Sequence, residues 1–198
     1  SSLFVTLIAI ASGAFAGGDD IGRTTEKELH VVLSAGFGKI TVERGSSSKI
    51  FSTERTDAKE GGVRADYSIR NRTGFLEIEL DGEQKREGEK KRGVHIAFGG
   101  EWTLKFCDEI PVSFDIQLGV AKGVIDLSGL QVKDFNLECG ASDVLVSFDE
   151  PNVVSMDELN IECGVSKFEA RNLGNANFKR FKFQGGVGAA TLDFSGAL

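Results

Sequence analysis

The sequence predicts an all-β fold, a right-handed β-helix-like solenoid of short stacked rungs, with a β-sandwich as the alternative. A five-residue phrase recurs four times with glycine in second place, at Gly119, Gly140, Gly164 and Gly186. These glycines are 21, 24 and 22 residues apart, and a period of 20–50 residues is typical of stacked repeat units. The 198-residue chain also has 25 Gly and 15 Phe but only 2 Pro, which favours short strands joined by tight turns.

Each repeat unit shows the alternation of a half-buried strand. In the first unit it places Ile116, Leu118 and Val120 on one face, and the later units carry matching sets. A second short strand follows the glycine, with Val144, Val146 and Phe148 in one unit. Stacking such units about 4.8 Å apart buries one continuous core. We expect the repeat glycines at bends, where a positive φ or a close backbone approach excludes a side chain.

The residues before the repeats predict a less regular flank, on which the sandwich alternative depends. Ala35–Lys39 is an isolated earlier copy of the phrase. Asn71–Gly74 predicts a hairpin turn, and the charge run 81–93 predicts a solvated loop. Strands are expected at Lys49–Thr53, Tyr67–Arg70, Phe75–Leu80, Val94–Phe98 and Trp102–Phe106.

The first sixteen residues resemble a cleavable export signal. Leu3–Ala16 is apolar and too short to span a bilayer comfortably, and Ala14 and Ala16 form the small-x-small pattern of a signal-peptidase site. A buried first strand or an uncleaved anchor is the alternative. Because no initiator Met precedes it, this signal is expected to be incomplete. The predicted organisation is a signal peptide at 1–16, a polar leader at 17–29 and one solenoid domain at 30–198, in a protein exported to the periplasm or cell surface.

No catalytic, metal-binding or cofactor-binding constellation stands out. The net charge of −7 argues against nucleic acid as a partner. His30 and His95 lack further ligands at metal-binding spacing. Asp126 and Asp193 occupy equivalent positions and are expected to cap turns, although such acids could serve a carbohydrate-active β-helix enzyme. The sequence therefore predicts a non-enzymatic protein without cofactor or metal, and that enzyme is the alternative.

Two of the three cysteines share one repeat position. Cys139 and Cys163 are equivalent, and Cys107 is left over. They can be small buried apolar residues or a disulfide formed after export. We expect free thiols, because neighbouring strands give a suitable Cα spacing but a slightly long Cβ spacing.

Several segments resemble a bacterial family. Trp102, Ile110-Pro111 and Phe114–Ile116 are similar to its opening segment, and residues 119–130, 161–174 and 185–196 are similar to its rungs. The family is the toastrack-type domain of LiaF-like cell-wall-active antibiotic response proteins and of putative adhesins. The resemblance implies an extracytoplasmic, envelope-associated binding or scaffolding module whose partner is an envelope protein or a cell-wall glycan. An export signal in place of several membrane spans departs from the LiaF-like members.

The last repeat unit is expected to be incomplete. Asp193–Gly196 matches Asp126–Gly129, but only Ala197 and Leu198 follow it. The sequence thus predicts a domain truncated at its C-terminus, with an open strand edge that favours end-to-end self-association.

Overall fold

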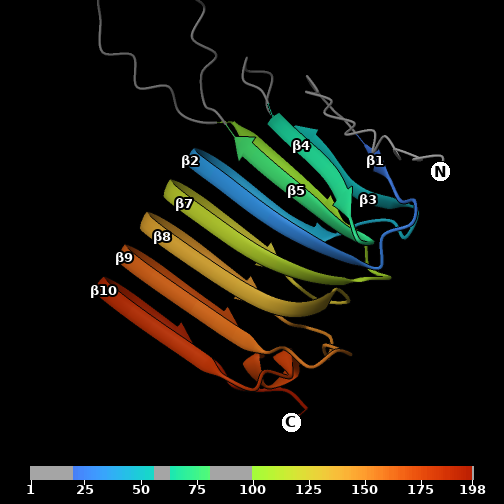
Figure 1. The fold of residues 1–198 in the computed structure, drawn as a ribbon. Helices are drawn as coiled ribbons and strands as arrows, with labels where there is room; N and C mark the ends of the chain where they lie inside the picture. Colours follow the sequence, from blue (N-terminus) through green and yellow to red (C-terminus); the bar gives the residue numbers. More distant parts are fainter. Residues whose placement is uncertain (1–19, 56–62, 81–99, 198) are drawn as a thin grey trace, which may run out of the picture.

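The computed structural model describes residues 20–55, 63–80 and 100–197. The predicted signal segment with Ala14 and Ala16, the strand at Val94–Phe98 and the charge run 81–93 lie outside these residues. The described chain forms one mixed ten-stranded sheet that is not closed into a barrel (Figure 1). Its one helical element is a 3-10 turn at Leu173–Ala176. No helix among the described residues is long and apolar enough to cross a membrane. The prediction of an all-β fold is confirmed.

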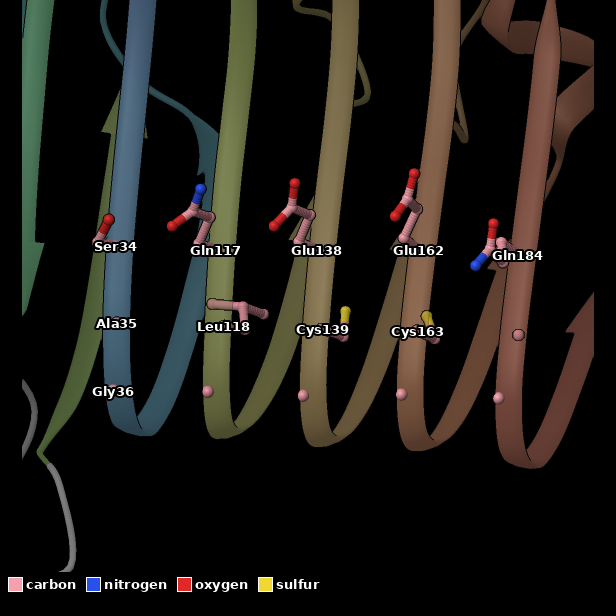
Figure 2. Close-up of a pocket in the computed structure, with 15 residues that line it drawn as sticks. Ser34, Ala35, Gly36, Gln117, Leu118, Glu138, Cys139, Glu162, Cys163 and Gln184 are labelled. Atoms are coloured by element: carbon pink, nitrogen blue, oxygen red, sulfur yellow. The ribbon is translucent and has the colours of Figure 1, made fainter.

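Five long parallel strands lie side by side in the order β2, β7, β8, β9, β10. Each bends at its repeat glycine into a first arm before the bend and a second arm after it, and Figure 2 shows the ribbons folding back there. Equivalent residues pair in register, for example Ala35 with Leu118 and Cys139 with Cys163. The isolated phrase at 35–39 therefore lies directly beside the first repeat, as its sequence indicated. The bounds are Glu28–Arg44, Pro111–Asp126, Gln131–Ser147, Glu158–Arg171 and Phe181–Leu192.

The alternation of buried residues changes phase at every bend. Leu118 is buried before the bend in β7, and the next buried residue is Ala121, three positions later. Because a strand alternates with period two, one extra residue at the bend lets both arms turn their apolar side chains inward. The expectation that Val120 continues the core face is therefore wrong, and so is the same expectation for Ala141, Val165 and Val187, which are exposed.

The flank branches from β2. The first arm of β2 pairs with β5 (Thr73–Leu80), and its second arm pairs with β6 (Glu101–Phe106). Antiparallel strands extend each branch: β4 (Val63–Arg70) lies beside β5, and β3 (Lys49–Arg55) lies beside β6. A two-residue turn joins β4 to β5, with positive φ at Asn71 and Arg72, as in the tight turns that match strand twist.

Part of the predicted polar leader belongs to the folded domain. Ile21–Gly22 forms β1 beside β3, and β2 begins at Glu28. Glu26 between them is buried. Its carboxylate accepts hydrogen bonds from the Thr24 and Thr25 backbone N–H groups and from the Thr24 hydroxyl, at 2.8–2.9 Å. The polar groups of this part of the leader are thus satisfied locally, and the sheet includes residues before residue 30.

One hydrophobic core fills the space between the arms and continues into the flank. Aromatic side chains supply much of it, and Phe106 contacts both Phe51 and Phe114. Carboxylates cap the turns that follow two of the strands: the Asp126 carboxylate accepts a hydrogen bond from the Ser128 N–H, and Asp193 does the same for Ser195. The expectation that these two aspartates cap turns is confirmed.

Candidate functional site: the strand bends

A groove of about 780 Å³ runs across the bends of the five parallel strands (Figure 2). Each strand contributes three consecutive residues to it: an outward one, an inward one and the glycine. Four long polar side chains form one rim, where Gln117, Glu138, Glu162 and Gln184 stand in register on successive strands. The inward positions are Ala35, Leu118, Cys139, Cys163 and Gly185.

The glycines make the floor of this groove bare backbone. A Cβ built on Gly119 would lie 2.6 Å from the Gly36 carbonyl oxygen, and those on Gly140, Gly164 and Gly186 would lie 2.6–3.0 Å from the preceding glycine's oxygen. None of these four has a positive φ; near the bends a positive φ occurs at Gly38 and Gly188. Close backbone approach thus accounts for glycine at these four positions.

Cys139 and Cys163 lie side by side, in register on neighbouring strands, at the inward positions of the groove (Figure 2). Both are buried, and both are free, as is Cys107. The interaction between the two neighbouring thiols lowers the pKa of Cys163 and, with burial, raises that of Cys139. Ser166 also favours the Cys163 thiolate.

A row of exposed apolar side chains lies on the outside of the bends, beside the groove. This bend row consists of the residue after each glycine: Phe37, Val120, Ala141, Val165 and Val187. Phe37 and Val120 are 52% and 54% exposed, and Val165 and Val187 are 63% and 73% exposed. Neighbouring strands lie about 4.8 Å apart, so the row is roughly 19 Å long. A contiguous exposed apolar strip of this kind is a candidate contact surface.

Charged side chains of opposite sign border the bend row. Glu138 and Glu162 stand on its first-arm side. On its second-arm side Lys39, Lys122, Asp143 and Lys167 occupy successive register positions. The bend row thus has acidic side chains on one side and mostly basic side chains on the other. Such an arrangement is complementary to an apolar surface bordered by charges of both signs.

The groove does bring two carboxylates together. Glu138 and Glu162 are in register on adjacent strands, and both are exposed. A glycosidase places its two carboxyl groups on opposite sides of the scissile bond and in different environments. These two glutamates share one face and one environment, an arrangement suited to contacting a ligand by charge. Within the described residues, no group of three or more His, Cys, Asp and Glu side chains could hold a metal ion.

Sequence reasoning located the glycines and cysteines of this surface but missed the bend row. It assigned Val120, Val165 and Val187 to the core because it assumed that buried and exposed residues alternate without interruption across the glycine. The available signal was the three-residue step from Leu118 to Ala121. Polar residues before and after the bend, such as Gln117 and Lys122, also mark it as solvent-facing.

One protein of known structure shares this architecture. A putative cell adhesion protein from Clostridium sporogenes ATCC 15579, of known crystal structure, superimposes with a TM-score of 0.66 at 17% identity, covering 91% of this chain and 99% of that one. A putative adhesin from Bacteroides fragilis NCTC 9343 aligns at 11% identity over 90% of this chain and 96% of that one, with a TM-score of 0.20. No curated protein matches. A family model described as the N-terminal domain of toast_rack, DUF2154, matches residues 16–171, and the chain therefore belongs to the toast_rack family.

Proposed function

We propose that this protein is a non-enzymatic, exported module of the bacterial envelope, adhesin-like, whose bends bind another envelope protein. Its parallel strands form the rungs of a right-handed β-solenoid, and that scaffold holds the bend row rigid. The bend row is the observation that carries the proposal, because the aliphatic side chains of Val120, Val165 and Val187 gain most from contact with an apolar protein surface.

Three further features support the proposal. Leu3–Ala16 has the composition of an export signal. The Clostridium structure with the same fold is described as a putative cell adhesion protein. The charges of opposite sign beside the bend row would orient a partner on it, since complementary charges fix register more than they add affinity.

A cell-wall glycan is the competing partner, favoured by the amide and carboxylate rim at Gln117, Glu138, Glu162 and Gln184.

Binding of the labelled protein to isolated bacterial envelopes tests the proposal. Phe37→Lys and Val165→Lys each place a charge in the bend row, and we expect each to weaken binding by about tenfold or more. Val153→Lys is the matched control, because Val153 is 77% exposed but lies outside the row. Protease treatment of the envelopes should abolish binding. If a peptidoglycan hydrolase abolishes it instead, the partner is a glycan, and unchanged binding of both variants would remove the bend row from the interface.

A carbohydrate-active enzyme is the second candidate, favoured by the paired carboxylates of Glu138 and Glu162. Release of reducing ends from peptidoglycan and envelope polysaccharides would measure this activity. We expect none above that of a Glu138→Gln/Glu162→Gln double variant. Activity that both single substitutions abolish would replace the binding proposal with the enzymatic one.

A further inference from the structure

The last strand, β10, presents an edge that no described strand covers. It pairs with β9 on one side, and among the described residues it has no second partner. Its 12 residues include one charge, Lys182, and no proline, whereas exposed edges are usually protected by charges, prolines or bulges. Phe181, Phe183 and Leu192 only partly cover the end of the core beside it. This edge therefore has the properties of an interface.

The direction of its free backbone groups is fixed by the bonds to β9. The Arg180 carbonyl accepts from the Leu159 N–H at 2.9 Å, and the Asp193 N–H donates to the Ala170 carbonyl at 2.9 Å. Backbone groups alternate in direction along a strand. The groups of Phe181 and Phe183 in the first arm, and of Ala190 and Leu192 in the second, therefore point to the free edge.

We infer that β10 pairs with β10 of a second copy of this chain about a two-fold axis through the bend. Such an axis exchanges the two arms, so the first arm of one copy runs antiparallel to the second arm of the other. The residues whose backbone groups point to the free edge are odd-numbered in the first arm and even-numbered in the second, because the alternation changes phase at the bend. Only a pairing of odd with even residues aligns both the hydrogen-bonding groups and the inward side chains.

One register fits the side chains best. It places Phe183 opposite Ala190 and Phe181 opposite Leu192 of the other copy, so a large side chain meets a small one at the first of these pairs. Four such pairs, two from each copy, give about eight backbone hydrogen bonds. The bend rows of the two copies would then form one continuous row. The inference of a dimer does not rest on the proposed function.

The same register brings opposite charges together on the outer face, Arg180 of one copy against Asp193 of the other. Asp193 uses its Oδ1 for Ser195, which leaves Oδ2 free. Arg180 lies 3.4 Å from Glu158, and Glu158 has a closer ion-pair partner in Lys182 at 2.5 Å. Arg180 can therefore turn to the second copy without leaving an unpaired carboxylate.

Sedimentation equilibrium of the full chain, with charge reversal, tests this arrangement. We expect a discrete dimer whose dissociation constant rises about tenfold or more in Arg180→Asp and in Asp193→Arg. The double variant should restore dimerisation, because the two reversed charges then face each other across the axis. Lys179→Asp is the control, since Lys179 pairs with Asp157 in its own chain. A dimer in which the double variant does not recover affinity would contradict the two-fold register.

Ala190→Pro provides a second test that leaves the bonds to β9 in place. Its N–H points to the free edge, so proline removes only a donor that the second copy would use. We expect a folded monomer with an unchanged circular dichroism spectrum. A wild-type monomer at all concentrations, open-ended polymers, or coverage of the edge by another segment of the same chain would each overturn the inference.

Discussion

At the residue scale, the repeat glycines differ sharply in the space around them. A Cβ on Gly119 would meet the Gly36 carbonyl oxygen at 2.6 Å, whereas a Cβ on Gly36 would meet nothing within 4 Å. We predict that Gly119→Ala lowers the free energy of unfolding by about 1–3 kcal/mol, the usual cost of overpacking. Gly36→Ala, the matched control, should be neutral or slightly stabilising. Urea denaturation measures both, and equal effects would show that close approach is not what requires glycine.

A second residue-scale prediction concerns Glu26. Burial raises its pKa, but hydrogen bonds from Thr24 and Thr25 outweigh that effect and hold the pKa below its usual 4.5. A pKa depressed by folding adds stability that is present above pH 4.5 and is lost as the pH falls through the folded value. Glu26→Gln should therefore cost about 1–3 kcal/mol at pH 7, and this difference should shrink below pH 4.5.

Urea denaturation of both proteins at pH 7 and at pH 3.5 measures that difference. Glu77→Gln serves as the control, because Glu77 is exposed and its substitution should have little effect at either pH. A Glu26→Gln cost that is the same at both pH values would mean that the charge of Glu26 does not contribute to folding.

At the element scale, one buried amide connects three successive turns. Asn152, in the connection from β8 to β9, accepts from the Val132 N–H at 3.1 Å and donates to the carbonyls of Val132 and Ala176 at 2.7 and 3.1 Å. Asn152→Ala should cost about 2–4 kcal/mol, because it leaves buried backbone groups unpaired. Asn160→Ala, which removes one half-buried side-chain bond to Asn136, should cost less than about 1.5 kcal/mol. Thermal unfolding compares them, and similar costs would contradict a special role for Asn152.

At the scale of the whole molecule, β2 is the junction of the fold. It pairs with β5 and β6 on one side, through different arms, and with β7 on the other. We predict that the amides of Val31, Leu33 and Val42 exchange hydrogen only through global unfolding, whereas those of β4 at the flank edge exchange earlier. Hydrogen exchange read by mass spectrometry measures this order. Faster exchange in β2 than in β4 would mean that the flank and the repeats unfold independently.

The sequence by itself determined the repeating architecture, because glycine spacing and period-two alternation are local consequences of backbone geometry. The Ala35–Lys39 copy, the hairpin at Asn71 and the register of Cys139 with Cys163 all followed from such patterns. Tertiary structure alone decided what lies at the bends. Val120 is exposed and Ala121 faces the core because the strand bends at Gly119. There the backbone lies close to that of the neighbouring strand, and this contact exists only when the strands are stacked. The exposed bend row follows from that stacking, which no single repeat contains.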